Sequence, residues 1–135
     1  MGNFGFTVSI AGDINGDALS DLAVNARTAT AIGVPSAGQV HVYLGRSMMA
    51  PSPLLTIDGT QTNSDHGRAL TILGDINGDL IDDLAIGVPF FTVNGAALTG
   101  KVQLHLGTAA GIVANPSLTL AAPVSAGAFG ACLAE

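Results

Sequence analysis

Apolar residues in this chain occur in short runs that Gly, Pro, Asn and Asp interrupt, and no apolar stripe recurs with helical spacing. Runs of this kind predict short β-strands joined by tight turns. Several runs are apolar at consecutive positions, which is typical of strands covered on both faces. We therefore predict an all-β protein. The predicted strands are residues 4–11, 21–26, 39–44 and 54–57, followed by residues 66–73, 83–88, 101–106 and 117–120.

The second group of four strands repeats the first after 62 positions. The hexapeptide Gly-Asp-Ile-Asn-Gly-Asp at residues 12–17 recurs unchanged at residues 74–79, and residues 38–45 resemble residues 100–107. Four antiparallel strands in a repeat of about sixty residues match one blade of a β-propeller. The sequence therefore predicts two four-stranded blades.

The blade boundaries follow from the repeat. We predict a first blade at residues 1–65 and a second blade at residues 66–128. A third copy begins after them, because Phe129-Gly130 repeats Phe4-Gly5. Residues 129–135 are therefore predicted to be the first strand of a third blade, or a strand exchanged with a neighbouring molecule.

The repeated hexapeptide opens two loops of nine residues, 13–21 and 75–83, with oxygen-bearing side chains at loop positions 1, 3, 5 and 9. Calcium takes about six to eight oxygen ligands, whereas zinc prefers His and Cys. We predict two bound Ca²⁺ per chain, one in each loop, with a backbone carbonyl at position 7 as a further ligand. The predicted ligands are Asp13, Asn15, Asp17, Leu19 and Asp21 in the first loop, and Asp75, Asn77, Asp79, Ile81 and Asp83 in the second.

Two other motifs also contain aspartate-rich loops. The helical EF-hand carries a bidentate Glu at its twelfth position, where this chain has Val24 and Ile86, so that motif is excluded. The alternative is a hairpin stabilised only by Asx turns, in which aspartate and asparagine side chains hydrogen-bond their own backbone. Turns of that kind need one or two such residues, so the cation loop is favoured.

The composition argues against several classes of function. The formal charge is −6, and the basic residues Arg27, Arg46, Arg68 and Lys101 form no cluster, so neither nucleic acid nor an anionic membrane is an expected partner. No apolar run is long enough to span a bilayer, and no signal peptide is visible. The three histidines lie beside no activated nucleophile, so no enzymatic activity is expected.

Phe90 and Phe91 are candidates for ligand contact or for packing against a neighbouring blade.

The order Phe-Gly, aspartate loop, and Asp-Leu-Ala-Ile-Gly-Val-Pro at residues 83–89 resembles the FG-GAP repeat of integrin α-subunit β-propellers and their bacterial relatives. The resemblance implies a cation loop between the first and second strands of each blade, facing away from the ligand-binding side. It also implies an extracellular or cell-surface adhesion platform. The chain departs from the pattern at Ala18 and Leu80, where Gly is usual, at His66 in place of Phe, and at residues 25–27, which read Asn-Ala-Arg.

The sequence is compatible with three functions. The favoured one is a calcium-binding, integrin-like module that serves as an extracellular adhesion or protein-binding platform. The alternatives are a lectin propeller that binds a glycan and a non-catalytic propeller fragment of a larger secreted enzyme. The absence of Trp weighs against the lectin, because sugars commonly stack on aromatic rings.

Two blades cannot close a ring, because propellers have about four to eight blades. The chain is therefore predicted either to belong to a longer propeller or to assemble head to tail with copies of itself. Three chains would give about six blades and four would give about eight.

Overall fold

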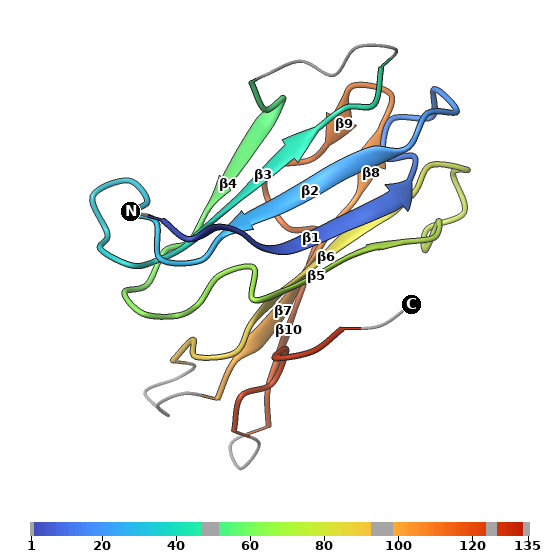
Figure 1. Ribbon diagram of the computed structural model, residues 1–135. Helices are drawn as coiled ribbons and strands as arrows, with labels where there is room; N and C mark the ends of the chain where they lie inside the picture. The colour runs from blue at the N-terminus through green and yellow to red at the C-terminus, as the bar shows by residue number, and fades with distance from the viewer. Residues whose placement is uncertain (1, 47–51, 93–98, 124–126, 134–135) are drawn as a thin grey trace.

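The computed structural model describes residues 2–46, 52–92, 99–123 and 127–133, and it shows two four-stranded antiparallel sheets (Figure 1). In both sheets the strands follow one another in chain order, and no helix occurs in the described residues. The first sheet contains β1 (Phe4–Gly12), β2 (Asp21–Ala26), β3 (Gln39–Tyr43) and β4 (Leu55–Asp58), and the second contains β5 (Ala69–Leu73), β6 (Asp83–Val88), β7 (Lys101–His105) and β10 (Leu118–Ala121). The all-β prediction and the two blades are confirmed.

A small hairpin between β7 and β10 was not predicted. It pairs β8 (Gly107–Thr108) with β9 (Gly111–Ile112). Strands of two residues show no alternation of apolar and polar positions, so a sequence pattern does not reveal them. The hairpin brings Ile112 into the core.

The two sheets pack face to face, as neighbouring blades of a propeller do, and one apolar cluster fills the space between them. Polar contacts also cross this interface, among them those from Thr7 Oγ1 to the Arg68 carbonyl at 2.7 Å, from the Ile72 N–H to Ser9 Oγ at 2.9 Å, and from Asn25 Nδ2 to the His66 carbonyl at 2.8 Å. The buried apolar cluster consists of Ile14, Ala23, Val40, Val42, Ile57, Leu70, Ile72, Leu84, Ile86, Val88 and Ile112.

The third repeat predicted at residues 129–135 is described only up to residue 133, and residues 127–133 form no strand. Phe129 makes only an isolated parallel bridge with Gly100. The strands β1 and β5 are each held by pairing along β2 and β6, and no described strand pairs with residues 127–133 in that way.

The backbone at Phe129 nevertheless repeats the arrangement at the start of the second blade. The Phe129 N–H donates to the Thr99 carbonyl at 3.1 Å, as the His66 N–H does to the Ala37 carbonyl at 3.3 Å. Gly67 and Gly130 have φ angles of +81° and +83°. A Cβ at either glycine would crowd the third strand of the preceding blade, so this turn requires Gly.

The outer face of each blade is apolar and open. On the first blade, the side chains of Phe4, Phe6 and Val8 are each about half exposed. On the second, a hollow of about 380 Å³ is lined mainly by apolar side chains of β5, β7 and β10 and by residues of the segment 129–133. Leu118 and Leu120 on β10 are also substantially exposed.

Candidate cation-binding loops

Both predicted cation loops lie at the same edge of the blades, between the first and second strands. The segment that follows the third strand reaches the same edge, since the Gly45 N–H donates to Asp21 Oδ1 at 2.7 Å. The second blade repeats this contact between the Gly107 N–H and Asp83 Oδ1 at 2.9 Å. Seven of the ten acidic residues of the chain therefore gather at one edge. They are Asp13, Asp17, Asp21, Asp75, Asp79, Asp82 and Asp83.

The aspartate at loop position 1 organises the backbone around it. Asp13 accepts hydrogen bonds from the N–H groups of Gly16, Asp17 and Ala18 at 2.7, 3.0 and 2.7 Å. Burial raises the pKa of the Asp13 carboxyl, but these backbone donors outweigh it, and the pKa lies below its usual value.

The second loop has the same arrangement around Asp75. This carboxylate accepts the N–H groups of Gly78, Asp79 and Leu80 at 2.6, 3.1 and 2.6 Å. The Leu80 N–H is the main cause of the lowered pKa of the Asp75 carboxyl. Both position-1 carboxylates are therefore held in the ionised form at neutral pH.

Positions 3 and 5 of each loop also lie together. Asn15 Nδ2 donates to Asp17 Oδ2 at 3.1 Å, and Asn77 Nδ2 donates to Asp79 Oδ2 at the same distance. Position 7 is tied to position 5 through its backbone. The N–H groups of Leu19 and Ile81 donate to the carboxylates of Asp17 and Asp79 at 2.9 and 3.0 Å.

Position 9 also contacts the backbone behind the loop. The fully buried Asp21 accepts the N–H of Ile14 at 2.8 Å as well as that of Gly45, and Asp83 likewise accepts the N–H of Ile76 at 2.9 Å. Burial raises the pKa of the Asp21 carboxyl. The position-9 carboxylates anchor each loop to the strands behind it.

The structure thus brings positions 1, 3 and 5 together and uses position 9 as an anchor. Within the described parts of the chain, no three acidic, histidine or cysteine side chains converge as a ready metal centre. The donors nevertheless suit a hard cation, since each loop presents carboxylate, amide and carbonyl oxygens without sulfur or imidazole. The groups that would hold it are the side chains at positions 1, 3, 5 and 9 of each loop and the backbone carbonyl at position 7.

Each loop contains a left-handed turn at positions 4 and 6. Gly16 and Gly78 have φ angles of +76° and +85°, and the non-glycine residues Ala18 and Leu80 have φ angles of +66° and +71°. Side chains other than Gly and Asn are disfavoured there. The two departures from the usual Gly therefore lie at strained backbone positions, and the loop keeps its curled shape despite them.

One residue that sequence reasoning missed joins the two loops. Asp82 lies at position 8 of the second loop, and its Oδ2 accepts the Asp13 N–H at 2.8 Å. The Asp82 N–H donates in return to the Asp13 carbonyl at 2.9 Å. The signal in the sequence was a fourth aspartate at a position where the first loop has the neutral Ser20.

Stacked four-stranded blades with an aspartate-rich loop between their first two strands define a β-propeller repeat protein. The FG-GAP repeat matches residues 4–43 and 66–105. The chain belongs to the FG-GAP repeat family, as the sequence resemblance predicted. This membership agrees with the expectation that the chain is not an enzyme.

Integrin α subunits are among its curated relatives. The chain is 35% identical over 121 residues to integrin alpha-8 of Gallus gallus and 36% identical over 121 residues to integrin alpha-5 of Xenopus laevis. These matches cover 87% of this chain and 11% of each relative. Integrin alpha-IIb of Homo sapiens is 34% identical over 136 residues, which covers 94% of this chain and 12% of that protein.

The chain therefore spans about a tenth of the length of these relatives. None of its described residues form a helix long and apolar enough to cross a membrane.

Proposed function

We propose that this chain is a calcium-binding module of an integrin-type β-propeller, with one Ca²⁺ in each of its two aspartate loops. The observation that carries the proposal is the shared geometry of the loops, in which positions 1, 3 and 5 are drawn together around a curled backbone. The proposed ligands in the first site are Asp13, Asn15, Asp17, the Leu19 carbonyl and Asp21, and those in the second are Asp75, Asn77, Asp79, the Ile81 carbonyl and Asp83.

Charge also supports calcium in these loops. Seven carboxylates at one edge repel one another, and two divalent cations would change the formal charge of the chain from −6 to −2. The ions would supply this neutralisation, and the chain's own residues would hold them through oxygen atoms. We expect dissociation constants on the order of 10⁻⁴ M, as in other extracellular modules.

Thermal unfolding with and without calcium tests the proposal. An ion that binds only the folded state stabilises it by about 2.7 kcal/mol per site at a hundredfold excess over the dissociation constant. Excess chelator should therefore lower the melting temperature by several degrees, whereas magnesium at equal ionic strength should restore little of it. A melting curve that is the same in chelator and in calcium would refute the calcium sites.

We further propose that the module serves as an extracellular or cell-surface platform for adhesion or for binding another protein. The similarity to integrin α subunits over most of the chain supports this role. A lectin function and a place in a larger secreted enzyme are the alternatives. A glycan array separates the first of these from protein binding, because only a lectin would retain the calcium-loaded chain on neutral sugars.

Completion of the ring by other blades is the last part of the proposal. The outer faces of both blades are apolar, and patches of this kind on soluble proteins commonly mark an interface. We propose that a face of a following blade covers the hollow beside Phe129, either in a longer propeller or in a head-to-tail assembly of three or four chains. Light scattering on the pure chain distinguishes these, since a stable monomer at high concentration would exclude the closed homo-oligomer.

A further inference from the structure

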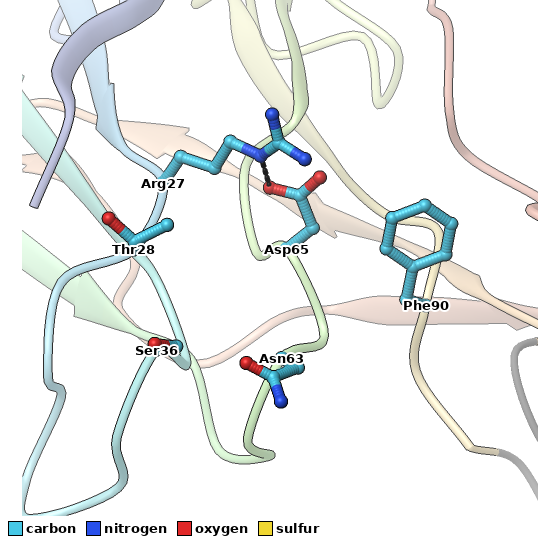
Figure 2. Close-up of a pocket in the computed structure, with 6 residues that line it drawn as sticks. All are labelled: Arg27, Thr28, Ser36, Asn63, Asp65 and Phe90. Atoms are coloured by element: carbon cyan, nitrogen blue, oxygen red, sulfur yellow. Dashed lines mark hydrogen bonds and ion pairs between the residues drawn. The ribbon is translucent and has the colours of Figure 1, made fainter.

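A second polar site lies at the edge of the blades opposite the cation loops. It is a pocket of about 240 Å³ at the junction of the two blades, built from the β2–β3 connection, the β4–β5 connection and the residue that follows Pro89 (Figure 2). The lining residues are Arg27, Thr28, Ser36, Asn63, Asp65 and Phe90. Five of these six side chains are polar, whereas the interface between the sheets beneath them is mainly apolar.

The charge of the pocket is set by two arginines that share one aspartate. Arg27 Nε lies 2.6 Å from Asp65 Oδ1, and Arg68 Nη1 lies 3.0 Å from Asp65 Oδ2. The Asp65 side chain is only 4% exposed, whereas about a third of each arginine side chain is exposed. The cluster therefore carries a net positive charge, and its positive groups are the ones that reach solvent.

Two contacts position the Arg27 guanidinium and leave its terminal nitrogens available. Its guanidinium lies 4.7 Å from the centre of the Phe6 ring, in a cation–π contact. Among the described residues, only Nε of this guanidinium makes a hydrogen bond or ion pair. A fixed guanidinium with two unpaired terminal amino groups is suited to bind an anion through two parallel hydrogen bonds.

The backbone around the pocket is also unusual. Ser36, Asn63 and Asp65 all have positive φ angles, of 50°, 57° and 60°. The Asn63 N–H donates to the Ser36 carbonyl at 3.0 Å, which joins the two turns. Strained backbone of this kind concentrates at ligand sites, and here it carries two side chains that can donate hydrogen bonds.

The acidic and basic residues of the whole chain are also divided between the two edges of the blades. Seven of the ten acids lie at the cation-loop edge, whereas three of the four basic residues lie at the pocket edge. Each of these three is placed over a phenylalanine ring: Arg27 over Phe6, Arg68 over Phe90, and Lys101 over Phe91. The asymmetry favours approach of an anionic group to the pocket edge.

We propose that this pocket binds a carboxylate group of a ligand. The two terminal amino groups of Arg27 bind the carboxylate, and Ser36, Asn63 and Phe90, which line the rest of the pocket, contact the remainder of the ligand (Figure 2). A single negative charge fits better than a phosphate dianion, because the buried Asp65 already neutralises one of the two arginines. The inference deepens the proposed binding role and rests on it, and it gives the ligand a chemical class.

Titration of the calcium-saturated chain tests the inference, with binding followed by NMR of backbone amides. The probes are glucuronate and N-acetyl-aspartate amide, which carry the carboxylate on a sugar and on an amino acid, with glucose and N-acetyl-asparagine amide as uncharged counterparts. Shifts should concentrate at residues 27–36 and 63–65. Binding of either acid and not of its neutral counterpart supports the pocket and identifies the source of the carboxylate.

Four variants separate a built site from diffuse attraction. Arg27→Lys keeps the positive charge but removes the pair of parallel N–H donors, and Arg27→Gln removes both the charge and the donor pair. Each variant should weaken binding by about tenfold. The control Arg46→Gln removes an exposed charge at the other edge and should leave binding unchanged. Asp65→Asn adds net positive charge but releases Arg27, so a positioned guanidinium predicts weaker binding and diffuse attraction predicts tighter binding.

Equal weakening by Arg27→Gln and Arg46→Gln, or tighter binding by Asp65→Asn, would overturn the proposal. Absence of binding by both acids would overturn it as well. Calcium stoichiometry and light scattering on the same samples report the cation sites and the assembly independently. A pocket that binds no carboxylate is therefore distinguishable from a chain that binds no calcium or does not assemble as proposed.

Discussion

The two copies of the hexapeptide Gly-Asp-Ile-Asn-Gly-Asp are identical in sequence but differ in their surroundings. Ile14 in the first copy is 1% exposed and belongs to the core, whereas Ile76 in the second copy is 50% exposed. The loops have the same internal hydrogen bonds, so the difference does not arise within them. It arises because the second blade covers the first loop, and no described residue covers the second loop in the same way.

The covering contact is specific as well as apolar. Asp82 holds the backbone of Asp13 through two reciprocal hydrogen bonds, and the carbonyl of Ile14 lies close to Gly107 of the second blade. A blade of this repeat therefore completes the cation loop of the blade before it. The local sequence specifies the shape of the loop, and the neighbouring blade determines how far it is buried.

The largest expected effect comes from truncating the isoleucine in each loop. Ile14→Ala should destabilise the chain by about 3 kcal/mol, because it opens a cavity in the core between the blades. Ile76→Ala should cost less than about 1 kcal/mol, since this side chain is already half in water. Urea unfolding in excess chelator measures both. Equal losses would show that the second blade does not brace the first loop.

The second effect concerns the residue before the repeat glycine, which is the exposed Phe4 in the first copy and the buried His66 in the second. Burial, with smaller contributions from Lys101 and His105, lowers the pKa of His66 to about 3. The unfolded chain therefore binds a proton near pH 6.5 that the folded chain excludes. Stability contributed by neutral His66 is present above pH 6.5 and is lost as the pH falls toward 3.

Between pH 7 and pH 5 this one group should cost the folded state about 2 kcal/mol. His66→Phe restores the residue of the other repeats and should remove that part of the pH dependence, while His41 and His105 still titrate. Denaturant midpoints of both proteins at the two pH values measure the difference. The same slope in the variant would contradict the buried, neutral state of His66.

The third effect isolates the bond between the loops. Asp82→Ala removes the carboxylate that accepts the Asp13 N–H and should cost about 1 kcal/mol. The matched control is Ser20→Ala at the equivalent position of the first loop, which is exposed and should change stability by less than about 0.5 kcal/mol. Hydrogen exchange at the Asp13 amide should accelerate only in the Asp82 variant. Unchanged protection of that amide would exclude the bracing role of Asp82.

The sequence predicted the strands well, because strands depend on local patterns. The runs around Asp21 and Asp83 predicted β2 and β6 with the bounds that the structure shows. The contacts of Asp82 and Asp65 were not predictable, because they join residues 69 and 38 positions apart in the chain. The anchoring hydrogen bonds of Asp21 were missed for a related reason, since spacing alone does not show which backbone N–H groups a carboxylate accepts.

The smallest expected effect comes from relieving the backbone strain at position 6, which both loops share. Leu80 is 91% exposed and adopts a φ angle of +71°. Leu80→Gly should stabilise the chain by about 0.5–1 kcal/mol, because glycine adopts this conformation without a steric penalty. Gly78→Ala, at a φ angle of +85°, should destabilise it by a similar amount. Thermal unfolding of both variants tests the sign, and stabilisation by Gly78→Ala would contradict the left-handed turn.

Calorimetric titration of calcium into the metal-free chain tests the central claim most directly. The variants Asp17→Ala and Asp79→Ala each remove one exposed position-5 carboxylate without touching the buried anchors Asp21 and Asp83. We predict two ions per wild-type chain, one in each single variant and none in the double variant, with tighter binding in the braced first loop. Absence of binding to the wild type, or an unchanged stoichiometry in the single variants, would contradict the account of two equivalent loops that differ only in their neighbours.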